Sequence, residues 1–249
     1  MEHKRYPILD SLRGLILISM IAYHTLWDMV YIFDENWMWY KSDGARLWQQ
    51  SICWSFILLS GFCWSFGRVK WKRGVIVFLA GAIITIVTLV AMPENVVLLG
   101  VLTLLGSCML LMIPLEKLLK HVNAFVGLLV CMLLFLFTRK VHRGYLGFGQ
   151  WRALTLPEEW YANLITTYVG FPAESFYSTD YFPLIPWLFL FIAGYFIYRI
   201  FQGNKWMKYL EGGKNVILEM LGKHSLVIYM IHQPLVYGIL YFVYKILLV

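Results

Sequence analysis

Long apolar runs are the feature that most constrains this 249-residue chain. A helix needs about 20 predominantly apolar residues to cross the hydrocarbon core of a bilayer. Apolar residues make up 60% of the chain and charged residues 14%, and the mean hydropathy is +0.67. Since a soluble domain carries about 25% charged residues, apolar surface on this scale needs lipid as its solvent. Seven runs predict spans, at 8–33, 46–66, 74–92, 96–115, 122–138, 183–200 and 222–247.

These runs predict an all-α fold, a polytopic transmembrane helix bundle of about seven spans that forms a single domain over residues 1–249. The segment 139–182 is too polar to span and is expected to face outward. The four cysteines (Cys53, Cys63, Cys108 and Cys131) all fall inside apolar runs. There they behave as small hydrophobes, so we expect neither a disulfide framework nor a metal site.

The distribution of basic residues predicts the orientation. The formal net charge is +7, a surplus that can indicate a nucleic-acid partner. Here, however, the basic residues form short clusters between apolar runs, as the positive-inside rule expects of cytoplasmic loops. With the N-terminus inside, thirteen of the 21 Lys and Arg lie on the inner side and seven on the outer side. We expect a multi-pass integral membrane protein, without nucleic acid, whose first helix is not cleaved as a signal peptide.

Four ionisable residues interrupt the first apolar run: Asp10, Arg13, His24 and Asp28. Each costs about 2.5–3.5 kcal/mol on insertion scales. At about 100° per residue, all four fall on a stripe roughly 60° wide, which we expect to face the bundle interior or a wet cavity. His24 and Asp28 are four residues apart, so the carboxylate can orient the imidazole as a general base. Arg13 can bind a phosphate or pair with Asp10.

The last apolar run carries a second polar group. Ser225 lies near its inner end, and the sequence His232-Gln233-Pro234 lies near its middle. Pro234 removes a backbone donor and frees a carbonyl one turn earlier. Such a break is tolerated at membrane depth where neighbours or water satisfy the freed group. These residues indicate a lined cavity, and a purely structural role in packing or hydrogen bonding is the alternative for each of them.

Short motifs along the chain resemble the membrane acyltransferase superfamily, which includes the acyltransferase-3 proteins. The first are Leu9-Asp10-Ser11-Leu12-Arg13-Gly14, a His ten residues after that Gly, and Leu59-Ser60-Gly61-Phe62. Three later stretches are similar to the bacterial branch of the heparan-α-glucosaminide N-acetyltransferase catalytic-domain family. They are Leu99-Gly100-Val101-Leu102, residues 180–187 (DYFPLIPW), and residues 221–234 with their LGKHSL and IHQP sequences. The resemblance covers essentially the whole chain.

The resemblance implies an acyl-CoA-dependent acyltransferase that is embedded in a bacterial inner or plasma membrane. It would move an acetyl group from cytosolic acetyl-CoA, its co-substrate, to an amine or hydroxyl of an extracytoplasmic glycan or amino sugar, without a metal. His24 would act as general base or acetyl acceptor, and Arg13 would handle acyl-CoA. In the animal lysosomal members an Asn stands where this chain has His24, so their mechanism and heparan substrate do not carry over.

The remaining candidate residues follow from combining the resemblance with the polar groups. We expect Asp28 to assist His24, and Asp10, Lys70 and Arg73 to join Arg13 in binding acyl-CoA. The basic loop at 68–73 is expected to be chiefly topological, with attraction of a polyanionic cofactor as a second role. The cavity and acceptor side is expected to involve Asp180, Tyr181, His232, Gln233 and Ser225, with Asp34 and Glu35 near sugar hydroxyls.

Two other functional classes remain open. A small-molecule transporter or flippase also needs a polar stripe, a broken helix and a mid-membrane site, although the chain contains no duplicated half. A non-catalytic assembly subunit would tolerate the loss of His24, whereas an enzyme would not. Saturable binding of acetyl-CoA separates the enzyme from both. A homodimer is left open by the sequence.

Overall fold

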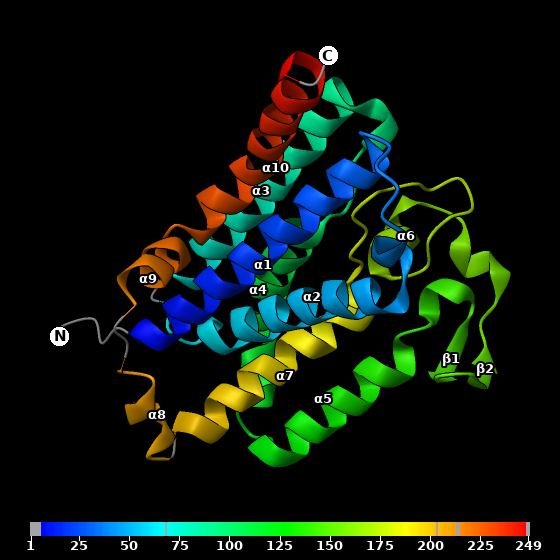
Figure 1. Cartoon of the computed structure of the whole chain (residues 1–249). Coiled ribbons are helices and arrows are strands. Elements are labelled where there is room, and N and C mark those ends of the chain that lie inside the picture. Colours follow the sequence, from blue (N-terminus) through cyan, green and yellow to red (C-terminus); the bar gives the residue numbers. More distant parts are fainter. Residues whose placement is uncertain (1–5, 68, 203, 213–214, 248–249) are drawn as a thin grey trace. The chain divides into compact units, whose positions relative to one another are not determined.

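Helices make up most of the chain in its computed structural model (Figure 1), which describes residues 6–67, 69–202, 204–212 and 215–247. The chain divides into two compact units. Unit 1 comprises Met1–Phe56 and Asn204–Val249, and unit 2 comprises Ile57–Gly203. Helix α2 (Asp43–Trp64) gives its first part to unit 1 and its last part to unit 2. The fold is an all-α bundle, as the apolar runs predicted.

Six helices within the described residues are long and apolar enough to cross a membrane. Their spans are Pro7–Tyr31, Lys70–Ala91, Val101–Leu119, Ala124–Arg143, Leu184–Gln202 and Ser225–Lys245. The predicted run at 46–66 is also helical, since it lies largely within α2, but it is not among these six. The chain is therefore an integral, multi-pass membrane protein, while the number of spans and the orientation stay predictions.

Apolar side chains left exposed on single helices mark the surfaces that lipid would cover. On α10 (Ser225–Phe242) the exposed Val227, Ile231, Leu235 and Ile239 recur every fourth residue. Such spacing places them on one face of the helix. The buried residues of α10, His232, Val236 and Leu240, also recur every fourth residue and lie on a neighbouring face. The buried histidine thus lies on a face other than the exposed apolar one, as a bilayer requires.

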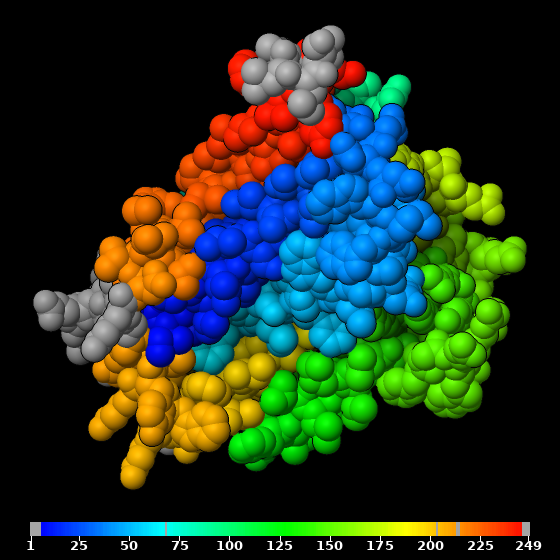
Figure 2. All heavy atoms as spheres, in the orientation of Figure 1, coloured from blue at the N-terminus to red at the C-terminus, as the bar shows by residue number. Residues whose placement is uncertain are grey.

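Unit 1 is built around α1 (Pro7–Tyr31), against which both α9 (Val216–Lys223) and α10 pack. Helix α10 runs alongside α1 in the ribbon and the space-filling views (Figures 1 and 2). The predicted last run at 222–247 begins inside α9, because that helix ends at Lys223. His224, with φ −100° and ψ 18°, separates α9 from α10. The remaining regular elements of unit 1 are a 3-10 turn (Met38–Lys41), α8 (Trp206–Tyr209) and a π-helical turn (Val243–Leu247).

Glycines allow α1 and α9 to approach backbone to backbone. A Cβ added at Gly14 would lie closer than 3.0 Å to the carbonyl of Leu218, and one added at Gly222 would meet the carbonyl of Asp10 in the same way. Small residues at such crossings are typical of membrane helix packing. Two of the motifs that carry the family resemblance, one ending in Arg13-Gly14 and one containing Gly222, therefore meet at this contact.

Unit 2 repeats this device between other helices. It contains α3 (Lys70–Ala91), α4 (Val101–Leu119), α5 (Ala124–Thr138) and α7 (Leu184–Gln202). Gly61 of α2 faces the carbonyl of Phe191, and Gly194 of α7 faces that of Leu58. Gly106 brings α4 against the backbone of α3 at Phe78. The close pairs of helices in this unit thus rest on glycine as well as on apolar side chains.

The polar segment 139–182 folds into short elements, as its composition led us to expect of a non-spanning region. Strands β1 (Tyr145–Phe148) and β2 (Trp151–Thr155) form an antiparallel pair with Tyr145 opposite Thr155. Short helix α6 (Leu164–Val169) begins with a capping box in which Asn163 and Thr166 exchange hydrogen bonds. The 3-10 turns of unit 2 are Pro93–Asn95, Val141–Arg143 and Glu158–Tyr161.

Candidate active site

The polar stripe of α1 faces protein, as its spacing predicted. Asp28 is fully buried, and the Asp10 and Arg13 side chains are only 17% and 21% exposed. Arg13 Nη1 donates to Asp10 Oδ1 at 2.6 Å. Of the two roles left open for Arg13, pairing with Asp10 is therefore present in the structure. The pair stands beside the α1–α9 contact, because Gly14 follows Arg13 directly and the carbonyl of Asp10 abuts Gly222.

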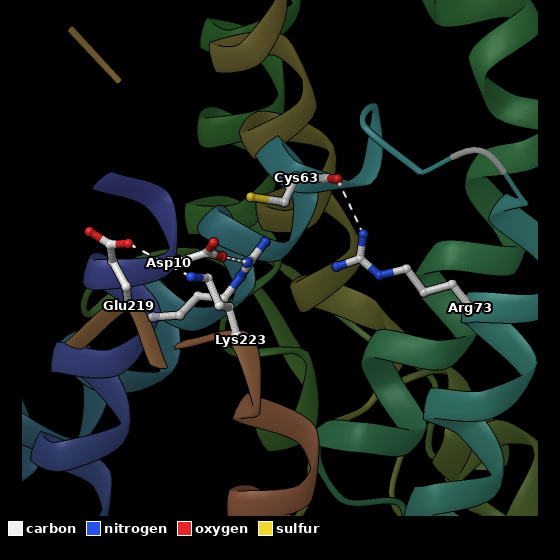
Figure 3. Close-up of polar contacts among 6 residues, drawn as sticks. Asp10, Cys63, Arg73, Glu219 and Lys223 are labelled. Atoms are coloured by element: carbon white, nitrogen blue, oxygen red, sulfur yellow. Dashed lines mark hydrogen bonds and ion pairs between the residues drawn. The ribbon is translucent and has the colours of Figure 1, made fainter. Parts of the chain in front are cut away.

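A second ion pair lies at the same end of unit 1, where Figure 3 draws Asp10 together with Glu219 and Lys223. Lys223 Nζ is 3.8 Å from Glu219 Oε2, one turn apart on α9. The Glu219 side chain is 17% exposed and that of Lys223 is 41% exposed. The sequence interpretation missed Glu219, although its spacing of four residues from Lys223 is the signal that could have found it.

Two histidines from opposite ends of the sequence meet further along α1. The ring centroids of His24 and His232 are 5.0 Å apart, with the ring planes at 61°. His232 is 7% exposed, and its Nδ1 lies 2.6 Å from the carbonyl oxygen of Tyr229. His24 is half-buried and also makes an edge contact with Tyr23. The structure thus joins His24 of the first run to His232 of the last, two residues that we had placed in separate groups.

Asp28 takes a partner different from the one expected. Its Oδ1 accepts a hydrogen bond from Gln233 Nε2 at 2.6 Å, and its Oδ2 has no hydrogen-bond partner among the described residues. The predicted pairing of the Asp28 carboxylate with the His24 ring is therefore absent from the described structure. A contact across two helices replaces a contact within one, because His232 occupies the space beside His24 and Gln233 reaches Asp28.

Three buried polar atoms in this cluster are left without a partner among the described residues. They are Asp28 Oδ2, His232 Nε2 and Gln233 Oε1. An unpaired buried polar group costs about 1–3 kcal/mol, so three in one place indicate a position for water or a ligand rather than a packed core. We call His24, Asp28, His232 and Gln233 the α1–α10 polar cluster.

Aromatic side chains hold α1 in place around this cluster. Trp48 Nε1 of α2 donates to Ser19 Oγ at 2.8 Å, and the Tyr40 hydroxyl donates to the carbonyl of Tyr23 at 3.1 Å. The rings of Tyr23 and Trp48 also meet edge to face. The buried Leu17 of α1 packs with Met20 and Ile52 in an apolar group of the same unit. These contacts anchor α1 at Ser19 and Tyr23, close to His24.

The basic residues of the 68–73 region are engaged within unit 2. Lys70 Nζ is 2.9 Å from Glu116 Oε2 and lies 3.8 Å from the ring centre of Trp64. Arg73 Nη1 donates to the carbonyl of Cys63 at 3.3 Å, near the end of α2 (Figure 3). These contacts join α2, α3 and α4 at the ends of those helices.

Asp180 and Tyr181 are placed in the loop before α7. Asp180 Oδ2 accepts from the backbone N–H of Val101 at 3.3 Å, at the first residue of α4. A carboxylate there complements the helix N-terminus. Burial raises the pKa of Asp180 to about 6, and the Val101 hydrogen bond works in the opposite direction. The Tyr181 hydroxyl donates to the carbonyl of Thr167.

Three other predicted residues belong to unit 1. Ser225 is half-buried at the start of α10. Glu35 Oε1 accepts from the Tyr244 hydroxyl at 3.0 Å. Asp34 adopts a left-handed backbone with φ 56° in the turn after α1. Neither acidic residue is brought into the α1–α10 polar cluster by a hydrogen bond within the described residues.

Apolar helices of spanning length and a buried polar cluster between two of them define a polytopic membrane protein with an internal polar site. The sequence model of the heparan-alpha-glucosaminide N-acetyltransferase catalytic family matches residues 5–234. The chain belongs to this family of membrane acetyltransferases, as its motifs suggested. The match includes residues of both units. Searches of curated proteins and of solved structures found no match.

Proposed function

We propose that this protein transfers an acetyl group from cytosolic acetyl-CoA to an amine or hydroxyl of an extracytoplasmic sugar, with His24 at the reacting centre. The observation that carries the proposal is the α1–α10 polar cluster. It combines two imidazoles, whose rings contact each other, with a carboxylate and an amide that are hydrogen-bonded to each other. All four groups lie within helices of spanning length. Ionisable groups within spans are costly and typically functional, and family membership supplies the reaction class.

The reaction needs a base or a nucleophile beside the thioester carbonyl. In one route, an imidazole removes a proton from the acceptor while the acceptor attacks the thioester. In the other, the His24 ring takes the acetyl group first and the acceptor then removes it from the ring. Both routes are compatible with a half-buried His24 whose ring meets Tyr23 and His232.

The donor would be held through its phosphates. Arg13, Lys70 and Arg73 are the candidates, because guanidinium and ammonium groups bind phosphate through charge-assisted hydrogen bonds. Arg13 and Lys70 each pair with a carboxylate in the absence of a donor. We infer that phosphate competes with Asp10 for Arg13 and with Glu116 for Lys70. Asp10 then controls the availability of Arg13 rather than contacting the donor.

The test uses the purified full chain in detergent with radiolabelled acetyl-CoA and a panel of amino sugars and oligosaccharides. CoA release and label on sugar or protein are followed for wild type, His24→Asn and Arg13→Gln. We expect His24→Asn to lose about 100-fold or more in turnover, the range for loss of a general base. Arg13→Gln should raise the KM for acetyl-CoA while leaving a folded protein.

His121→Asn is the matched control, because His121 is exposed in the connection between α4 and α5. Its turnover should equal that of wild type. Label retained on wild-type protein and absent from His24→Asn would identify the acetyl-histidine route. Absence of both acetyl-CoA binding and CoA release with every acceptor contradicts the proposed function, and a transport assay on proteoliposomes then becomes the next measurement.

A further inference from the structure

We propose that His232 is the proton acceptor of the reaction, and that Asp28 and Gln233 join it in binding the attacking group of the acceptor substrate. This inference rests on the proposed function and assigns to His232 the removal of the acceptor's proton, in either of the two routes given for His24. Each of the three side chains leaves one buried hydrogen-bond acceptor unpaired among the described residues of unit 1.

The tautomer of His232 is fixed by its backbone contact. Its Nδ1 lies 2.6 Å from the carbonyl oxygen of Tyr229. A carbonyl only accepts, so Nδ1 must carry the proton in this contact. In a neutral imidazole the other nitrogen then holds the lone pair. Nε2 is buried and has no partner among the described residues, so it is available as an acceptor.

Gln233 is oriented in a similar way. Its Nε2 donates to Asp28 Oδ1 at 2.6 Å, and a carboxylate oxygen would repel the amide oxygen in the same position. The amide is therefore turned so that Oε1 faces away from Asp28. Oε1 is also buried and without a partner among the described residues. The amide thus contributes a second acceptor.

Asp28 completes the set. The residue is 0% exposed, and Oδ2 accepts from no donor within the described residues. A carboxylate with one oxygen held by Gln233 and the other free supplies a third acceptor. The titratable groups around His232 are His24 and Asp28 on α1 and Tyr229 on its own helix. None of these brings a fixed positive charge to the cluster.

Three unpaired acceptors, one of them on a carboxylate, select a ligand by charge and hydrogen-bond type. They suit an amino or hydroxyl group that donates, and the Asp28 carboxylate disfavours phosphate and carboxylate groups. The phosphates of the donor therefore do not bind here, and this position belongs to the sugar. Arg13, the proposed donor residue of unit 1, lies on α1 about three turns before His24, so the two ligands would contact different parts of the same helix.

The chemical step conserves atoms and charge. The nitrogen or oxygen of the acceptor attacks the thioester carbonyl carbon as its proton passes to His232 Nε2. A C–N or C–O bond forms, the C–S bond breaks, and the CoA thiolate leaves. Return of the proton from the His232 imidazolium to sulfur gives free CoA and the acetylated sugar. If the acetyl group first passes to His24, the CoA thiolate leaves in that first step and takes the ring proton of His24. The acceptor then attacks the acetyl-imidazole as its proton passes to His232 Nε2, the C–N bond to His24 breaks, and the proton returns from His232 to the His24 ring.

Two variants separate basicity from hydrogen bonding at position 232. His232→Asn keeps a donor that can reach the Tyr229 carbonyl but has no group at the position of Nε2. His232→Gln keeps a polar atom near that position that can accept from the substrate but is not a base. With D-glucosamine and radiolabelled acetyl-CoA, we expect kcat to fall about 100-fold or more in both variants. The KM for D-glucosamine should rise only in His232→Asn.

The tautomer is tested independently of turnover. Nitrogen NMR of ¹⁵N-histidine-labelled protein distinguishes a ring nitrogen that carries a proton from one that carries a lone pair. The chain contains 6 histidines, and the signals lost in His232→Asn assign those of His232. A protonated Nδ1 with a lone pair on Nε2 supports the inference. A proton on Nε2 of the neutral ring overturns it.

The failure of this inference is distinguishable from that of the proposed function. If wild type transfers acetyl and His24→Asn does not, while His232→Asn keeps a normal kcat, the role of His232 is refuted and the proposed function stands. If wild type transfers no acetyl to any compound of the panel, both fall. His121→Asn again serves as the control, and variants are compared only when they elute as folded protein on size exclusion.

Discussion

The contact between α1 and α9 gives a quantitative prediction for Gly14→Ala. The added Cβ would lie closer than 3.0 Å to the backbone carbonyl of Leu218, so α9 must retreat by about 1 Å to restore ordinary contact. The gain in helix propensity is about 1 kcal/mol. Overpacking costs about 1–3 kcal/mol and occasionally more, and the cost here lies at the upper end, about 3 kcal/mol, because a backbone neighbour cannot rotate away. We therefore expect a net loss of about 2 kcal/mol in the free energy of unfolding.

The measurement is the apparent Tm of the purified protein in detergent at a fixed heating rate. At about 2–4 °C per kcal/mol for a chain of this size, Tm should fall by about 4–8 °C. Gly238→Ala is the matched control, because Gly238 also lies in a helix and a Cβ there would meet no atom within 4 Å. That variant should melt at or above the wild-type temperature. Equal Tm values for the two variants would refute the close α1–α9 contact.

Three further substitutions separate structural from functional roles. Asp180→Asn removes a carboxyl whose raised pKa, about 6, makes its ionised form unfavourable in the fold. Below about pH 3.8 the free energy of unfolding of the wild type should match that of the variant. It should fall relative to the variant as pH rises to about 6 and stay lower above that pH. Apparent Tm values measured over this pH range check the prediction. Trp64→Phe removes the buried hydrogen bond to the Met109 carbonyl and should lower the free energy of unfolding by about 1–3 kcal/mol, measured by thermal unfolding. Trp71→Phe is the control, because Trp71 is exposed, and it should change that free energy little. Glu116→Gln should change stability by less than about 1 kcal/mol and lower the KM for acetyl-CoA, because it frees Lys70; an unchanged KM would assign Lys70 a purely structural role.

Hydropathy and helical spacing were sufficient to predict most of the fold. The apolar runs correspond to helices, and the stripe of Asp10, Arg13, His24 and Asp28 faces protein because charged groups within spans avoid lipid. The Asp10–Arg13 pair could be anticipated because residues three apart share a helix face. The spacing of apolar and polar residues along the chain thus predicts both where the helices lie and which face of each helix is polar.

Contacts between helices could not be predicted from hydropathy and helical spacing. Spacing suggested that Asp28 would pair with His24, but Asp28 accepts from Gln233, which is distant in sequence. Lys70 likewise pairs with Glu116 of another helix. The break at His224 was also missed, since the apolar run continues through it. In each case the outcome depends on which helix packs against which, and periodicity within one helix does not contain that information.

The paired glycines of α1 and α9 have a consequence for the history of this sequence. Gly14 and Gly222 each touch the backbone of the other helix, so a larger side chain at either position displaces both helices. Related proteins that lose one of these glycines should therefore also alter the opposing helix, and the two motifs should vary as a single unit. A comparison of many such sequences would reveal this coupling as correlated changes between the beginning and the end of the chain.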